Sequence, residues 1–488
     1  MSLRKQAIRA VLWNGVGNYL GFIISFAGQL FLVRLLLPED FGVVAMAVSI
    51  LEVLALLTAW TLSVGIIQMP REEGLSDTAY WLSLGQSILL LSITGAVSLG
   101  LETFYPGSPQ LVRVFAVIGA TRALMPIASI YGAHLEKELH YRALSLLKAV
   151  VGLSATSIAM AMALMGQGVW SLVAREAVIN LASLAGLRYM SGYRFRGQFS
   201  ADKARRLIAL GNKTLFSRGL EAAYYKVDSL LVGSMAGVTA LGFYSQARYV
   251  VDLVNAAVAP ASGVAIFPIY AKLQHDEIRL RRAFQTGRFL LVRILLPACI
   301  FILLFPEELV TFLFGDQWKP AASFLRWLAL YPLLISLYEN CKALLYGIGR
   351  LGVTALIRAI QILALIPMVL VGYKTIGVEG VAIAATISAF VGLLAMHIAT
   401  RVYMSGGLIE TLLRPMTVAL ISSLGVFWLE QSLMSPAAGP YVLGLMVLLV
   451  GMYASLLLFL EFAVLREYFT AIAGALRAEP PASDNTLS

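Results

Sequence analysis

The sequence predicts an all-α, polytopic membrane protein with about fourteen transmembrane helices, a fold class that follows from its composition and from the length of its apolar runs. Of the 488 residues, 59% are hydrophobic and only 13% are charged, and the mean hydropathy is +0.82. A soluble domain carries about 25% charged residues. This chain has about half that share, which is too little for the surface of a water-soluble protein. A helix that crosses a bilayer needs about 20 mostly apolar residues, which is the length of the runs here. The short alternating segments of a transmembrane β-barrel do not occur in the sequence.

Turn residues separate the apolar runs and set the borders of the expected spans. Pro38-Glu39-Asp40 and Gly166-Gln167-Gly168 are examples of such turns. The first run is too long for a cleaved signal peptide, so it is expected to stay as an anchor. Cys299 and Cys341 lie inside apolar runs, which predicts neither a disulfide framework nor a metal site. The expected spans lie near residues 10–33, 42–66, 79–101, 111–133, 144–165, 169–190, 214–235, 241–270, 286–305, 321–346, 352–372, 378–400, 412–431 and 441–463.

The distribution of basic residues predicts the orientation of these spans. With the N-terminus inside and successive spans alternating, most of the 37 lysines and arginines fall on inside connections, among them Arg350 and Arg358. Only Arg34, Lys319 and Lys374 fall on outside connections. This asymmetry follows the positive-inside rule. We therefore expect a multi-pass protein of the cell inner (plasma) membrane with both termini in the cytoplasm.

A central polar segment and a faint internal repeat predict the domain organisation. The longest polar connection, residues 191–213, falls in the middle of the chain and is expected to be a cytoplasmic linker. At an offset of 200 residues, Phe41-Gly42-Val43-Val44 matches Leu241-Gly242-Phe243-Tyr244. Repeats separated by an even number of spans keep the same orientation, which predicts two pseudo-symmetric lobes. The expected domains are an N-terminal six-helix lobe (1–190), the linker (191–213), a C-terminal six-helix lobe (214–400), two additional transmembrane helices (401–465) and a polar cytoplasmic tail (466–488).

Charged side chains inside the predicted spans indicate where a functional site would lie. A charge at the centre of a bilayer costs on the order of 2.5 kcal/mol or more, so it usually faces a bundle interior or a cavity. Arginine binds phosphate oxygens as a fork and lysine as a point charge, so a basic cavity suits a diphosphate. The candidates for binding an anionic substrate are Arg122, Arg175, Arg218, Lys226 and Arg248. The candidates for ion coupling are Glu52, Glu221, Asp228 and Asp252.

Each of these charges also has a purely structural interpretation. Arg248 and Asp252 are four residues apart, so they can simply pair on one helix. Motifs of enzymatic chemistry are missing from the sequence, including a P-loop, a Rossmann glycine pattern, HExxH and CxxC. No catalytic residue, metal or cofactor is therefore expected, and the protein is predicted not to be an enzyme.

The turn between the first two spans carries a motif that resembles a known family. Arg34-Leu35-Leu36-Leu37-Pro38-Glu39-Asp40-Phe41-Gly42 is similar to the R-L-L-x-P-x-D-F-G turn of Wzx-type and teichuronic-acid-type polysaccharide flippases, which belong to the multidrug/oligosaccharidyl-lipid/polysaccharide (MOP) superfamily. A second resemblance is Gly242-Phe243-Tyr244-Ser245-Gln246-Ala247, followed by Phe267-Pro268 and a basic loop. The likeness covers about residues 5–400.

This resemblance implies a carrier of two lobes around an aqueous, cationic cavity. The implied substrate is an undecaprenyl-diphosphate-linked oligosaccharide, flipped from the cytoplasmic to the periplasmic leaflet by alternating access for exopolysaccharide or lipopolysaccharide biosynthesis. Prolines within the spans, such as Pro126, Pro260 and Pro332, would allow the bends that such a carrier needs. The expected partners are this lipid-linked substrate, membrane lipids and other polysaccharide assembly proteins, and no nucleic acid.

Several alternatives stay open at this point. Related lipid II flippases carry basic residues deep in the first span, whereas residues 10–33 contain none, which argues against a peptidoglycan precursor. A cation-coupled drug exporter of the same superfamily is a second function, against which the basic interior argues. A membrane-embedded polysaccharide polymerase or ligase would carry a large periplasmic loop, but the longest outside connection is about 306–320. A scaffold that recruits assembly enzymes through the linker is the last alternative.

Overall fold

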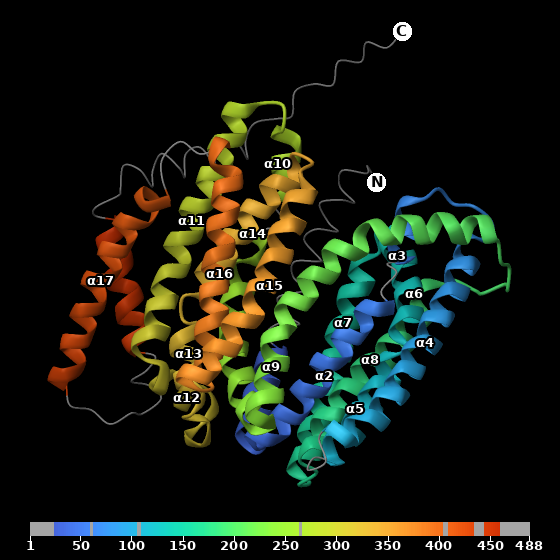
Figure 1. Ribbon diagram of the computed structural model, residues 1–488, viewed down its shortest axis with the longest axis horizontal. Helices are drawn as coiled ribbons and strands as arrows, with labels where there is room; N and C mark the ends of the chain where they lie inside the picture. Colours follow the sequence, from blue (N-terminus) through green and yellow to red (C-terminus); the bar gives the residue numbers. More distant parts are fainter. Residues whose placement is uncertain are drawn as a thin grey trace. The chain divides into compact units, whose positions relative to one another are not determined.

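The computed structural model describes residues 24–58, 62–104, 109–262, 266–403, 408–433 and 444–458, and all regular structure in this part is helical (Figure 1). Helices satisfy every backbone N–H and C=O within the segment, which lipid requires. Eight helical segments in the described part are long and apolar enough to cross a membrane: Leu75–Leu101, Pro109–Lys137, Tyr141–Leu164, Gly219–Val258, Glu277–Leu304, Ala321–Gly347, Leu351–Ile376 and Glu379–Thr400. Shorter apolar helices cover Ile24–Leu35, Leu413–Val426 and Gly444–Leu458. The all-α class is confirmed, and the number of fourteen spans stays a prediction.

The chain folds into two compact units that do not follow a single cut in the sequence. Unit 1 comprises Met1–Tyr249, Leu313–Phe324 and Ala355–Ser388, and unit 2 comprises Val250–Phe312, Leu325–Thr354 and Ala389–Ser488. Helices α9 (Ala201–Ser262), α13 (Ala321–Leu328), α15 (Leu351–Ile376) and α16 (Glu379–Thr400) contribute residues to both units. The lobes expected at 1–190 and 214–400 stay a prediction.

Unit 1 contains a bundle of helices that pack side by side. α7 packs on α8, α4 on α5 and α6, and α2 on α5 (Figure 1). A break at Ala123 and Leu124 separates α5 from α6, and Pro126 lies in the first turn of α6, where its missing N–H costs no helical hydrogen bond. The span expected at 111–133 is therefore two helices. The bundle helices are α2 (Pro38–Thr58), α3 (Leu62–Gln68), α4 (Leu75–Phe104), α5 (Pro109–Arg122), α6 (Met125–Lys137), α7 (Tyr141–Leu164) and α8 (Val169–Ser191).

Helix α9 contains the span expected at 214–235 and most of the span expected at 241–270, and only Gly237 interrupts its regular geometry. Gly237 has φ 84° and ψ 173°, a backbone conformation that is essentially restricted to glycine. The turn between the two spans is thereby reduced to one residue. α9 ends at Ser262, and the short helix α10 (Phe267–Leu273) follows.

Two glycines bring the start of α2 into backbone contact with α9. A Cβ atom built on Gly42 would lie 1.7 Å from the carbonyl oxygen of Val238, and one built on Gly242 would lie 1.9 Å from the carbonyl oxygen of Pro38. The contact is reciprocal, since each glycine accommodates a carbonyl of the other helix. Gly42 and Gly242 are also the residues that the offset of 200 relates in sequence. The internal repeat thus places its two equivalent glycines together.

A buried tryptophan supports this glycine contact. Trp318, in the short helix η1 (Asp316–Trp318), is fully buried, and its indole N–H donates to the carbonyl oxygen of Val33 at 2.8 Å. Its ring meets Phe41 edge-on at 5.5 Å between centroids and Phe243 at 5.9 Å. One aromatic residue therefore packs against a neighbour of each glycine.

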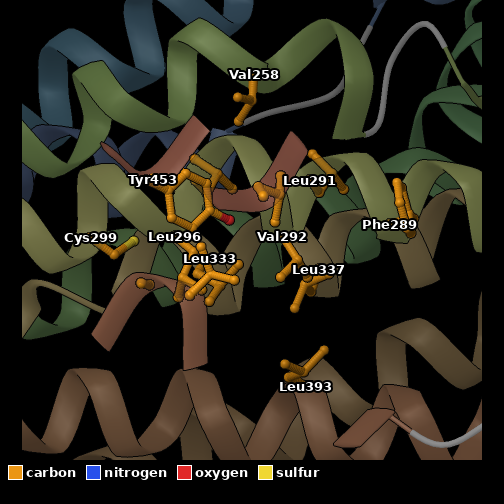
Figure 2. Close-up of a cluster of buried hydrophobic side chains, with 14 residues drawn as sticks. Val258, Phe289, Leu291, Val292, Leu296, Cys299, Leu333, Leu337, Leu393 and Tyr453 are labelled. Atoms are coloured by element: carbon orange, nitrogen blue, oxygen red, sulfur yellow. The ribbon is translucent and has the colours of Figure 1, made fainter. Parts of the chain in front are cut away.

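Unit 2 is centred on helix α11 (Glu277–Leu304), which packs against α14 (Tyr331–Gly347) and α17 (Leu408–Leu433). Figure 2 shows its main hydrophobic cluster, to which α11 contributes side chains at helical spacing, including Leu291, Leu295 and Cys299. Leu333 and Leu337 of α14 lie in the same cluster. Cys299 and Cys341 are both buried thiols without a disulfide.

The segment expected to be a plain basic linker is fixed to the protein. Residues 192–200, here called the linker strap, connect α8 to α9 and lie on the first turn of α4. The buried carboxylate of Asp77 accepts the Tyr193 hydroxyl at 2.5 Å and the backbone N–H groups of Arg196 and Gln198 at 3.0 and 3.1 Å. The start of α9 then lies across the ends of α3, α4 and α6, where the fully buried Leu207 joins their hydrophobic cluster (Figure 1).

Asp77→Ala is expected to lower the free energy of unfolding of unit 1 by about 2 kcal/mol, because it leaves buried donors without an acceptor. Thermal unfolding in detergent measures this loss, and trypsin cleavage after Arg194 and Arg196 should become faster as the strap detaches. Asp202→Ala, which removes a carboxylate that is 76% exposed, is the matched control and should change neither result. Equal protease resistance of the two variants would contradict the anchoring role of Asp77.

An exposed ion pair adds a pH-sensitive contact beside the strap. Arg206 of α9 donates to Glu72 through two nitrogens, at 2.7 and 3.0 Å. This hydrogen bonding lowers the pKa of Glu72 and raises that of Arg206. Because the pKa of Glu72 is lowered, the contact contributes above the ordinary pKa of a glutamate and is lost as the pH falls through the lowered value.

Candidate functional site

One carboxylate in unit 1 bridges two basic side chains from two other helices. Glu52 of α2 accepts Nη2 of Arg122, from α5, at 3.0 Å, and its other oxygen lies 3.1 Å from Nζ of Lys226 in α9. We call these residues the Glu52 triad. Two cations and one anion leave one net positive charge. The three side chains are partly exposed, by 25% for Glu52, 27% for Arg122 and 32% for Lys226.

Arg175 brings a further positive charge to the interior of unit 1. Its Nη1 donates to the side-chain oxygen of Gln29 at 3.0 Å, and the amide nitrogen of Gln29 donates to Gln246 of α9 at 3.1 Å. Both glutamines are buried. Because an amide carries no charge, this contact orients the guanidinium without neutralising it.

Asp228 and Arg248 pair with each other across the break in α9. Oδ2 of Asp228 accepts Nη1 of Arg248 at 3.2 Å and the Tyr244 hydroxyl at 2.6 Å. Both members of the ion pair are more than nine-tenths buried. Asp228 precedes Gly237 and Arg248 follows it, so the pair connects the two halves of the helix. Asp252, the other possible partner of Arg248 on sequence spacing, belongs to unit 2 and is exposed.

A buried arginine of α15 was missed by the sequence analysis, which grouped it with a cytoplasmic connection. The Arg358 side chain is 2% exposed, and its Nε and Nη2 lie 3.2 and 2.8 Å from Oε1 of Glu221. Its Nη1 donates to Gln361 at 3.1 Å, and its guanidinium lies 4.3 Å from the centroid of the Tyr224 ring. The sequence did contain a signal for this buried contact. Arg358 and Gln361 are polar residues three apart in an otherwise apolar run, so they share one helix face.

The structure therefore distributes the predicted site residues among several polar contacts. Arg122, Lys226 and Glu52 come together, Arg175 joins a glutamine pair, and the other acids Glu221 and Asp228 each hold an arginine. Arg218 lies in α9, but its side chain is outside the described residues. Of these groups, the Glu52 triad brings two basic side chains to one partly exposed carboxylate.

Comparison with known proteins places this geometry in a family. The family described as "Polysaccharide biosynthesis protein" matches residues 31–323. The succinoglycan biosynthesis transport protein ExoT of Rhizobium meliloti (strain 1021) is 26% identical over 369 residues, which are 73% of each chain. The teichuronic acid biosynthesis protein TuaB of Bacillus subtilis (strain 168) is 25% identical over 56% of this chain and 57% of TuaB. The lipopolysaccharide biosynthesis protein WzxC of Escherichia coli (strain K12) is 21% identical over 78% of each chain.

Solved structures show the same fold at low sequence identity. The lipid II flippase MurJ in an inward closed conformation superposes with a TM-score of 0.75, at 12% identity, over 94% of this chain and 100% of MurJ. An inward-facing multidrug resistance MATE transporter of the MOP superfamily superposes with a TM-score of 0.50, at 14% identity, over 80% of this chain and 93% of the transporter. The MOP-superfamily fold that the turn motif implies is thereby confirmed.

The relatives also bear on the kind of activity. ExoT is named a transport protein and MurJ a flippase, and neither of these relatives is an enzyme. The family match extends over more than half of the chain. The chain belongs to the polysaccharide biosynthesis protein family and has the fold of the multi-pass membrane transporters of the MOP superfamily.

Proposed function

We propose that this protein flips an undecaprenyl-diphosphate-linked oligosaccharide from the cytoplasmic to the periplasmic leaflet of the inner membrane. The repeat units would serve exopolysaccharide or lipopolysaccharide biosynthesis. The observation that carries the proposal is the Glu52 triad, in which two cations from different helices converge on one accessible carboxylate. The polysaccharides named for ExoT, TuaB and WzxC support this substrate class.

Exchange of carboxylate for phosphate gives the triad a way to bind and to release its ligand. A diphosphate can accept Arg122 as a fork and Lys226 as a point charge. Since Glu52 already occupies both cations, an incoming diphosphate must displace it, and Glu52 can in turn displace the product. The competition weakens binding, which a carrier needs in order to discharge its substrate.

The remaining charges have supporting roles in this proposal. Arg175, held by Gln29, adds positive charge to the same unit, and Arg218 lies on the same helix as Lys226. Glu52, Glu221, Asp228 and Asp252 are the acids through which an ion gradient could be coupled. The proposed topology has both termini in the cytoplasm, with two six-helix lobes followed by two further helices.

Arg122→Gln and Lys226→Gln are each expected to lower flipping by about 10- to 100-fold, because a hydrogen bond to a charged group contributes roughly 1.5–3 kcal/mol. Flipping is measured in proteoliposomes with an undecaprenyl-diphosphate-linked oligosaccharide. Polymer export is measured in cells in which the chromosomal gene for this protein is deleted and the variant is expressed instead. Glu52→Gln is expected to tighten binding of the lipid-linked substrate, because the competing carboxylate charge is gone.

A matched control separates this effect from a general loss of positive charge. Lys319→Gln removes a lysine that is 58% exposed and paired with Asp316, and flipping should stay normal. Immunoblots and size-exclusion profiles verify that each variant is present and folded. Normal flipping by both Arg122→Gln and Lys226→Gln would reject the cationic site.

A further inference from the structure

The linker strap follows a path along the end of α4 that several contacts fix. α8 ends at Ser191, and Gly192, with φ 63°, turns the chain away from the helix axis. Beyond the bonds to Asp77, the Ser200 N–H donates to Thr78 at 3.2 Å, and the Trp81 indole N–H donates to the carbonyl oxygen of Gly197 at 3.3 Å. Because α4 contains the membrane-span candidate Leu75–Leu101, the strap is held at the level where this span begins.

Side chains along the strap alternate between the protein and the solvent. The Tyr193 ring stacks on His134 at 4.6 Å between centroids, and Phe195 packs on Tyr80 at 4.5 Å. Arg194 and Arg196, which alternate with these aromatic residues, are exposed. The strap therefore uses Tyr193 and Phe195 to attach to the bundle and presents two guanidinium groups outward.

Further basic and aromatic side chains lie near these two arginines, either in sequence or, for Trp81, through its hydrogen bond to Gly197. Tyr189 at the end of α8 is 89% exposed, Phe199 is 59% exposed, and Trp81 of α4 is 41% exposed. Arg188 and Arg205 are exposed as well. Aromatic rings beside basic groups at the end of a span are typical of the membrane–water interface. In water alone, such exposed rings would be unfavourable.

We propose that the linker strap and the end of α8 bind the headgroups of anionic phospholipids in the adjacent leaflet. Charge complementarity favours this occupant, since each lysine or arginine near an anionic leaflet contributes about 1 kcal/mol. The exposed rings of Tyr189, Phe199 and Trp81 insert beside the headgroups while Arg194 and Arg196 contact the phosphates. The site does not include the Glu52 triad, so it does not depend on the transported substrate.

Lipid titration of the full-length protein tests this site. The detergent-solubilised protein is titrated with phosphatidylglycerol, and bound lipid is counted by native mass spectrometry, with phosphatidylcholine of the same chain length as the neutral probe. The double variant R194Q/R196Q is expected to weaken phosphatidylglycerol binding by about fivefold per arginine and to leave phosphatidylcholine binding unchanged. The preference for phosphatidylglycerol should also decrease with added salt.

The controls separate the loss of these two arginines from detachment of the strap and from a general loss of positive charge. Asp77 accepts the backbone N–H of Arg196, so glutamine at position 196 preserves this hydrogen bond. Unchanged thermal unfolding of R194Q/R196Q verifies that the strap stays attached. R279Q/R281Q removes two charges that pair with Asp276 and Glu277 and should retain phosphatidylglycerol binding. R194K/R196K should restore binding because it restores the charge.

Two results would overturn the proposal. The first is wild-type affinity for phosphatidylglycerol in folded R194Q/R196Q. The second is displacement of phosphatidylglycerol from the strap by undecaprenyl diphosphate at equal concentration, which would make the strap a substrate site. Failure of the Glu52 triad as a transport site would change neither readout, because both measure lipid binding alone.

Discussion

Alanine at Gly42 or at Gly242 is expected to destabilise unit 1 by at least about 3 kcal/mol, the upper end of the usual range for overpacking. The added Cβ would lie 1.7 or 1.9 Å from a backbone carbonyl oxygen of the facing helix. A backbone atom cannot rotate away as a flexible side chain can, so α2 and α9 must separate. The fraction of monodisperse protein that survives heating, measured by size-exclusion chromatography, reports the loss.

Glycines elsewhere in unit 1 provide the control for this prediction. A Cβ at Gly85 or Gly95, both in α4, meets no atom within 4 Å. Alanine there should be neutral or stabilise the helix by up to about 1 kcal/mol, because glycine is a poor helix former. Equal thermal survival of Gly42→Ala and Gly85→Ala would contradict the close approach.

The reciprocal geometry of the glycine contact makes a second measurement possible. Once Gly42→Ala has separated the two backbones, Gly242→Ala meets a gap that is already wider. The double variant should therefore lose less stability than the two single variants added together. Full additivity would show that the two glycines act at independent contacts.

The contacts of the turn motif explain why its residue types could be recognised in the sequence. Asp40 accepts the backbone N–H of Leu37 at 3.1 Å and so stabilises the start of α2. Arg34 donates to the carbonyl oxygen of Leu313 at 3.3 Å, and Gly42 admits the backbone of α9. A motif of this kind depends on local geometry, which a short sequence specifies.

Pairing between distant charges could not be predicted in the same way. Sequence spacing offered Asp252 as a partner of Arg248 and gave no indication of the contact between Arg248 and Asp228, on the other side of Gly237. Helical periodicity indicates which residues share a face, and it does not indicate which helix that face meets. For the same reason the offset of 200 revealed a repeat without showing that Gly42 and Gly242 touch.

Arg358→Leu is expected to lower the free energy of unfolding by about 1.5–3 kcal/mol, because it removes the charge-assisted hydrogen bonds of a buried guanidinium. The Arg358 side chain is 2% exposed and holds both Glu221 and Gln361. Thermal unfolding measures the loss. Arg326→Leu is the control, since Arg326 lies 3.9 Å from Glu307 with both side chains more than half exposed, and such a surface pair contributes at most about 1 kcal/mol.

The double variant Glu221→Leu/Arg358→Leu separates a structural role of this pair from ion coupling. Apolar residues that replace both members of a buried ion pair are often neutral or stabilising, so most of the lost stability should return. If Glu221 only compensates Arg358, polymer export should return together with stability. If Glu221 carries the coupled ion, the double variant should be stable but inactive, because no carboxylate is left at that position. Export that tracks stability across the single and double variants would therefore remove Glu221 from the coupling candidates.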